Sequence, residues 1–282
     1  DMVHTTTSAF LGLTVKCARC HDHKFDPILQ SDYYRIASFF WAGHIGQGNQ
    51  GGPTGKDLGF DVYGWTDKSA EPLPIRLLMN GERHKPGPKI VPGFLSAITE
   101  LDKTLAAPPT NSKTTHRRLQ FAKWITDARN PLTARVLVNR LWQHHFGRPL
   151  VRTPNNFGYK SDPPTHPKLL DWLAAEFMEP TTGGAAPWTL KRLHKLIMMS
   201  DTYQQQSVHP QEVEYAQRDF LNRNLWKFNR HRLNSEALRD AMLAVSGQLN
   251  LKMGGSSFYP KMSSEALEGL SRKAGDWKDS PT

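Results

Sequence analysis

Proline and glycine interrupt the chain repeatedly between residues 43 and 115, and this stretch sets the first limit on the fold. Residues 43–64 lack hydrophobic periodicity, which predicts a long loop. Short apolar runs at 75–79 and 89–91, each between turn residues, predict two brief strands. We therefore expect only a small, irregular β portion, with the fold built mainly from helices on either side of it.

Helix start and stop signals support this mainly α reading. Asn130-Pro131 and Gly147 predict a helix over 131–146, because proline suits the first helical position and glycine suits a C-terminal cap. Similar signals predict further helices over 31–41 and starting near Pro167, Thr189 and Ser235. Helical spacing predicts that the last of these buries four side chains on one face, namely Leu238, Ala241, Met242 and Val245.

The break AAPPTNSKTT at 106–115 predicts a boundary between two domains, 1–105 and 106–282. The chain has 36 Lys and Arg against 26 Asp and Glu, a formal net charge of +10, which favours a polyanionic partner such as an acidic polysaccharide. Nucleic acid ranks last among such partners, because no recognition motif accompanies the charge. No apolar run has the length that spanning a membrane requires.

The stretch VKCARCHDHKFDP at 15–27 holds the only two cysteines, Cys17 and Cys20, followed directly by His21. C-x-x-C-H is the attachment sequence of c-type haem. The two thiols would bond the porphyrin vinyl groups, and the imidazole of His21 would be the proximal iron ligand. His23 and Asp26 follow closely, which suggests a hydrogen-bonded or metal-bearing turn beside the attachment site.

Two other readings of this motif stay open. Cys17 and Cys20 can bind zinc or iron without a porphyrin, with His21, His23 and Asp26 as further ligands. They can also close a disulfide in an oxidising compartment. Met79 is a candidate sixth haem ligand, although its apolar setting is more typical of a methionine that fills a core.

A second polar group lies on the helix predicted over 131–146. Arg135, Asn139, Arg140 and His144 form a candidate substrate or anion site. The alternative is that these side chains satisfy the irregular backbone of the following TPNNFG stretch. No signature of a nucleophilic enzyme is present, so the sequence leaves open whether the protein is an enzyme.

Long runs of the sequence resemble two planctomycete domains of unknown function. The run FLGLTVKCARCHDHKFDPILQSDYYRIASFF resembles the end of a cytochrome-c-associated domain, and THPKLLDWLAAEF, LKRLHKLIMMSDTYQQQS and RLNSEALRDAMLAVSGQL resemble the planctomycete-specific domain that follows it. The resemblance covers most of the chain. It implies a large, exported protein of the periplasm or cell surface, often with a separate cytochrome c domain, of which this chain holds a part that starts within the first domain and ends within the second.

The leading hypothesis is therefore an exported redox or metal-centre protein, with haem c at Cys17, Cys20 and His21 used for electron transfer to a partner protein. One alternative is a non-haem, metal-dependent enzyme or binding module that acts on an acidic polysaccharide. The other is a structural surface module with a Cys17–Cys20 disulfide.

Overall fold

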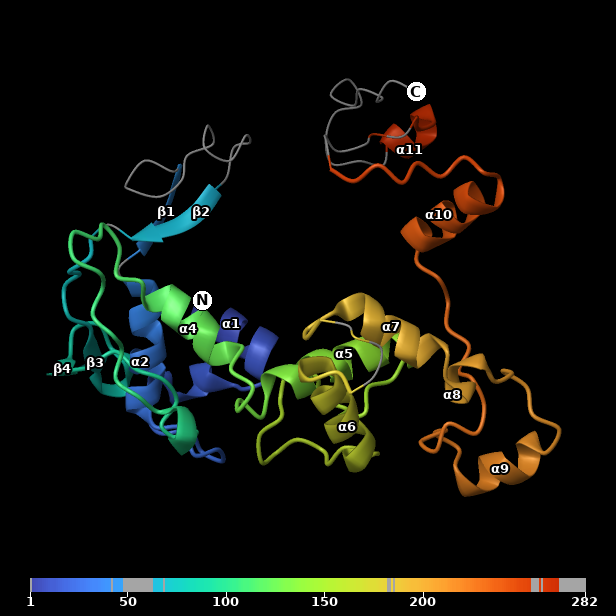
Figure 1. The fold of residues 1–282 in the computed structure, drawn as a ribbon, viewed down its shortest axis with the longest axis horizontal. Coiled ribbons are helices and arrows are strands. Elements are labelled where there is room, and N and C mark those ends of the chain that lie inside the picture. Colours follow the sequence, from blue (N-terminus) through green and yellow to red (C-terminus); the bar gives the residue numbers. More distant parts are fainter. Residues whose placement is uncertain are drawn as a thin grey trace. The chain divides into compact units, whose positions relative to one another are not determined.

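The computed structural model describes residues 2–41, 43–47, 63–67, 69–181, 184, 186–254, 259 and 261–268 (Figure 1). The chain divides into two compact units, Asp1–Arg230 and His231–Thr282. The fold is mainly helical, as the sequence predicted.

The first unit begins with helices that share one apolar cluster. They are α1 (Met2–Leu11), the short 3-10 helix η1 (Val15–Arg19), α2 (Gln30–Trp41) and α4 (Arg117–Ile125). Stacked aromatic rings join them: the Phe39 and Phe121 centroids lie 4.5 Å apart, and those of Phe94 and Trp124 lie 5.3 Å apart. Because aromatic side chains bury large apolar areas, these stacks fix how α2 and α4 pack.

The β portion consists of two antiparallel pairs. β1 (Gly43–Gln47) pairs with β2 (Tyr63–Asp67), and β3 (Arg76–Leu78) pairs with β4 (Pro86–Lys89). β3 confirms the strand predicted over 75–79, whereas β4 lies before the run predicted over 89–91 and shares only Lys89 with it. The loop predicted over 43–64 is wrong at both ends, where strands form by pairing across the chain, and residues 48–62 between them lie outside the described residues. The short 3-10 helices η2 (Met79–Gly81) and η3 (Thr99–Leu101) complete this region.

A second apolar cluster follows α4. It is built from α5 (Thr133–Phe146), α6 (Pro167–Met178) and α7 (Leu190–Met198), with α8 (Asp201–Gln204) and α9 (Glu212–Arg218) after them. The predicted helices near 131–146, Pro167 and Thr189 are confirmed. α5 starts two residues later than predicted and ends at Gly147, which has a φ of +77° as expected for a glycine cap.

Two backbone connections tie the clusters together. Phe157 N donates a hydrogen bond to Gly12 O at 2.7 Å, and the guanidinium of Arg140 donates to the carbonyls of Ser8 and Ala9 at the end of α1. Arg140 thereby satisfies carbonyls that have no partner inside the helix. The domain boundary predicted at 105/106 stays a prediction.

The second unit contains α10 (Ser235–Val245) and α11 (Ser264–Glu268). The side chain of Asn234 caps α10 by accepting from Ala237 N at 2.7 Å, which confirms the predicted helix. The burial predicted for its apolar face is wrong: Leu238, Met242 and Val245 are 52%, 67% and 91% exposed, and Ala241 is exposed as well. Helical spacing indicates an apolar face but does not supply an element to cover it. Within the described ranges, no helix has both the length and the apolar character that crossing a membrane requires.

Candidate functional site

Cys17 lies in the short 3-10 helix η1, and Cys20 directly follows its last residue. We call residues 15–21 the cysteine turn. A 3-10 helix has three residues per turn, so side chains at i and i+3 point the same way. Val15 and Ala18 accordingly share the buried face, while Cys17 and Cys20 are both exposed and both free. The sequence spacing therefore places two accessible thiols side by side.

Helix α2 holds the back of the cysteine turn. The carbonyl of Arg19 accepts hydrogen bonds from Gln30 Nε2 at 3.1 Å and from Tyr34 Oη at 3.0 Å. Both donors also reach the carbonyl of Leu78, at 2.9 and 3.5 Å. Burial raises the pKa of Tyr34, so its hydroxyl keeps the proton that it donates. The end of β3 is thus fixed beside the cysteine turn.

Gly81 lies against the second thiol. Its φ of +73° belongs to the left-handed region, and a Cβ added there would lie 2.5 Å from Cys20 Sγ. Both the backbone conformation and the lack of space require glycine at this position. One side of Cys20 is therefore packed, while its other side faces solvent.

His21 keeps one ring nitrogen available. Its Nδ1 lies 2.7 Å from the backbone carbonyl of Asp22. A carbonyl oxygen only accepts hydrogen bonds, so Nδ1 must carry the proton, and in the neutral ring Nε2 holds a lone pair. Histidines that bind metals through one nitrogen characteristically donate the other N–H to such a carbonyl. The exposed His21 ring is thus in the tautomer that a metal ligand needs.

His23 is arranged in the opposite way. We call residues 22–28 the anchor loop. The side chain of His23 is 6% exposed, and its Nδ1 accepts from the backbone N–H of Asp26 at 2.9 Å. Its Nε2 lies 3.0 Å from Thr14 Oγ1 and donates to that hydroxyl. A metal at His23 would have to replace one of these bonds.

Asp26 ties the anchor loop to a distant part of the chain. Its buried carboxylate accepts from the backbone N–H of Tyr159 at 2.7 Å, and Gly158 is packed directly against it. The loop is closed locally by hydrogen bonds from His23 N to Ile28 O and from Ile28 N to Asp26 O, at 2.8 and 2.7 Å. Asp26 and His23 therefore have structural partners, whereas Cys17, Cys20 and His21 expose their reactive atoms.

Within the part of the chain that the structure describes, no three His, Cys, Asp or Glu side chains gather where they could hold a metal ion. Met79 is 50% exposed, so its predicted role as core filler is wrong. It begins η2 at the rim of the β3–β4 pair, where a Cβ at Gly87 would lie 3.3 Å from its sulfur. The structure thus directs the Met79 thioether toward β4.

The candidate anion site on α5 is not brought together. Arg135 binds Asp171 Oδ1 through Nε at 2.7 Å, and Arg140 caps α1. Asn139 is fully buried and exchanges hydrogen bonds with the backbone N and O of Val151, at 2.8 and 3.0 Å. Of these three, Arg140 also contacts the TPNNFG stretch, through Asn155 Oδ1 at 3.0 Å and Pro154 O at 3.5 Å. Arg135 and Asn139 have their partners elsewhere, and His144 is exposed on α5.

The neighbouring His145, which the sequence analysis did not single out, pairs with a histidine of α7. Its Nε2 lies 2.8 Å from His194 Nδ1. Burial, and then the proximity of His194 and His144, lowers the pKa of His145. The lowered pKa favours the neutral form of His145 in this contact between α5 and α7.

Sequence reasoning also missed Gln30, Tyr34 and Gly81 as parts of the site. Only Gly81 had a readable signal, because Asn-Gly is a strong turn dipeptide. Gln30 and Tyr34 act through carbonyls far away in the chain, which no local pattern shows.

Comparison with known proteins gives two family matches. The model of PSD1, described as a protein of unknown function (DUF1553), matches residues 117–280. The model of PSCyt2, described as a protein of unknown function (DUF1549), matches residues 1–44, which include the cysteine turn. The order of the two confirms the resemblance found in the sequence. No curated protein and no solved structure matches the chain.

Proposed function

The chain belongs to the PSD1 family, described as of unknown function. We propose that its cysteine turn, which lies within the residues matched by PSCyt2, carries a covalently attached c-type haem used for electron transfer. Cys17 and Cys20 are the thioether anchors, and His21 Nε2 is the proximal iron ligand. When bound, the haem supplies an iron that cycles between two oxidation states and so passes single electrons. The partner is an electron-transfer protein in the periplasm or at the cell surface.

The tautomer of His21 is the observation that carries this proposal. The hydrogen bond from Nδ1 to the Asp22 carbonyl directs the free lone pair to Nε2 on the exposed side of the ring. The same bond restrains the ring before any iron arrives, which lowers the conformational entropy lost on ligation. The adjacent thiols are free and exposed on one face of the turn, so all three groups that haem attachment uses are accessible.

Occupied donors weigh against zinc or iron without a porphyrin. Such a site would need His23 or Asp26 to complete a tetrahedral set with the two thiolates. Both nitrogens of His23 and one oxygen of Asp26 already have partners inside the protein. Haem needs only the three exposed groups from this part of the chain.

The test is to export the full chain from a host that has a cytochrome c maturation system. We expect one haem per chain that survives denaturation and shows the pyridine haemochrome spectrum of a thioether-linked porphyrin. The double variant Cys17→Ala/Cys20→Ala should lose it entirely. His21→Ala should keep covalent haem but change the absorption of the iron, because the proximal ligand is missing.

Two control variants make the assignment specific. His144→Ala removes an exposed histidine of α5 and should leave the spectrum unchanged. His23→Gln should also leave the spectral position unchanged, since His23 is not a ligand in this proposal. Folded protein without covalent haem overturns the proposal. Bound zinc or iron without porphyrin would then favour the metal site, and a mass lower by two hydrogens would favour the disulfide.

A further inference from the structure

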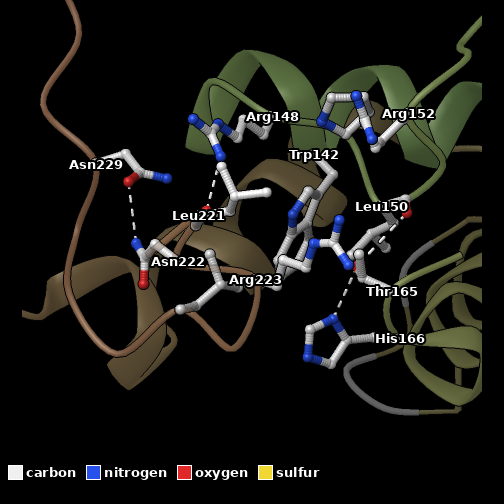
Figure 2. A pocket seen from close by; sticks show the side chains of 12 residues that line it. Trp142, Arg148, Leu150, Arg152, Thr165, His166, Leu221, Asn222, Arg223 and Asn229 are labelled. Atoms are coloured by element: carbon white, nitrogen blue, oxygen red, sulfur yellow. Dashed lines mark hydrogen bonds between the residues drawn. The ribbon is translucent and has the colours of Figure 1, made fainter. Parts of the chain in front are cut away.

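A pocket of about 300 Å³ lies between the end of α5 and the segment that follows α9. Its lining residues are all far from the cysteine turn in the sequence. We call it the arginine pocket. Figure 2 shows the indole of Trp142 in the middle, with Arg148 and Leu221 on one side and Thr165 and His166 on the other. Its size suits a ligand of one or two sugar rings, at the lower end of the range for small-molecule sites.

The charge around the arginine pocket is unbalanced. Arg148, Arg152 and Arg223 all line it, and none of its twelve lining residues is an aspartate or glutamate. Three cations around one small volume repel each other unless an anion neutralises them. The pocket therefore favours a negatively charged ligand.

The three guanidinium groups keep donors for such a ligand. Arg148 uses Nη1 to donate to the Leu221 carbonyl at 2.7 Å, which positions the group and leaves its other N–H groups. Arg152 lies 3.5 Å from Asp162, and both side chains are more than half exposed, so solvent weakens that pair. Asp219 accepts from the backbone N–H groups of Arg223 and Asn224.

The walls of the pocket are apolar and held in place. Trp142 stacks on Phe146 with a centroid distance of 4.2 Å, and Leu150 and Leu225 also line the space. The amide of Asn222 donates to Lys227 O at 2.7 Å and to Asn229 Oδ1 at 3.0 Å. These bonds fix the wall that the segment after α9 forms. A pocket formed before binding costs less to occupy than one that must be ordered by its ligand.

Asn222 and Leu225 in this wall have φ values of 51° and 54°, in the left-handed region. Asparagine is enriched there among non-glycine residues. The unbalanced charge and the preformed walls are the features that point to a ligand here.

We propose that the arginine pocket binds a uronic acid, either a free sugar acid or one unit of an acidic polysaccharide. Arginine forks match the planar carboxylate with paired hydrogen bonds. The apolar walls suit the C–H face of the sugar ring, and the amide nitrogen of Asn229 can donate to a ring hydroxyl. This binding site is separate from the cysteine turn and does not depend on haem.

The test is calorimetric titration of the full chain with D-glucuronate, D-galacturonate and D-mannuronate. D-galactose tests the sugar ring without the charge, and inorganic phosphate tests the charge without the ring. At least one uronate should bind more tightly than both probes, and the binding should weaken with added salt. Arg223→Gln should reduce that affinity by about tenfold, and Arg148→Gln by as much, because each removes charged hydrogen bonds.

Arg129→Gln is the matched control. It makes the same chemical change at an arginine whose ion pair is with Asp127, away from the pocket. It should leave uronate binding unchanged. Because Arg223 is exposed, its variant should keep the urea unfolding midpoint of the wild type, which separates loss of binding from loss of fold.

Three outcomes would overturn the proposal: no uronate binds, phosphate binds as tightly as the uronates, or Arg129→Gln weakens binding as much as Arg223→Gln. An oligogalacturonate that binds more tightly than the monomer identifies a polymer as the source of the sugar acid. Equal affinity per site identifies a free sugar acid.

Discussion

The cysteine turn and the anchor loop are consecutive in the sequence and carry similar chemistry, yet the structure treats them in opposite ways. Each contains a histidine and further groups that bind metals. In the turn, Cys17, Cys20 and His21 are exposed, whereas in the loop His23 and Asp26 are buried and hydrogen-bonded. Residue type alone therefore does not identify a ligand. The partner of each donor atom does.

The two histidines show how this works. The carbonyl of Asp22 makes His21 a donor at Nδ1, and the backbone N–H of Asp26 makes His23 an acceptor at the same atom. The two rings are thus opposite tautomers two residues apart. Of the two residues, His21 is the exposed one, and its lone pair is on Nε2.

The largest expected effect tests the anchor loop at Asp26. Asp26→Ala removes the buried carboxylate that accepts from the backbone N–H of Tyr159, so we expect the free energy of unfolding to fall by about 3 kcal/mol. Asp26→Asn keeps an accepting oxygen and should lose less. Urea denaturation measures both. Cys17→Ser, in the cysteine turn, should change stability by less than about 0.5 kcal/mol, and a loss equal to that of Asp26→Ala would contradict the comparison.

The second effect compares the histidines directly. His23→Ala removes one acceptor and one donor from a buried site, and it should lower the free energy of unfolding by about 2 kcal/mol. His21→Ala should cost less than about 0.5 kcal/mol, because its ring is exposed. The unfolding midpoints of the two variants in urea check this. Equal losses would show that the two tautomers do not mark different roles.

The third effect concerns Gly81 in the contact with Cys20. Gly81→Ala meets both an unfavourable φ and the Cys20 sulfur, and we expect a loss of about 2 kcal/mol. Gly147→Ala, with a φ of +77° and open space around it, isolates the cost of the backbone conformation. Replacing Cys20 by alanine in the Gly81→Ala background should recover the part of the unfolding free energy by which Gly81→Ala loses more than Gly147→Ala. If it recovers nothing, the thiol does not pack as the structure shows.

The smallest expected effect is the pH dependence of stability that His145 causes, outside both the cysteine turn and the anchor loop. The lowered pKa of His145 means that the unfolded chain binds more protons than the folded one as the pH falls below the ordinary value of 6.5. Stability should therefore be full above that pH and decline below it. His145→Gln should make the decline shallower in urea titrations at pH 5 and 7.5. An unchanged pH dependence would show that the His145–His194 contact does not contribute.

The sequence predicted α2, α5, α6, α7 and α10, because proline, glycine and apolar spacing act within a few residues. α5 and its cap at Gly147 are examples. It missed β1 and β2, since strands in a glycine-rich stretch form by pairing with each other and not by local pattern. The exposed face of α10 shows the converse limit, in which a strong local pattern has no partner element within the described part of its unit.

The sequence also predicted only part of the candidate site, because local spacing identifies groups but not their distant partners. The spacing C-x-x-C-H identified the groups that the structure leaves accessible. It could not separate His21 from His23, because the partners that fix their tautomers depend on how the backbone turns at Asp22 and Asp26. It also placed Arg140 in an anion site, although its partners are carbonyls in α1.

The hydrogen bond from Tyr159 to Asp26 joins positions 133 residues apart, which has a consequence for the order of events during synthesis. At ribosomal speeds of about 5–20 residues per second, the chain lacks this partner for roughly 7 to 27 s after Asp26 is made. During that interval the anchor loop has only its local bonds, and the neighbouring thiols sit on a less restrained backbone. Any enzyme that modifies Cys17 and Cys20 would thus meet an easier substrate before the Tyr159 bond forms than in the finished protein.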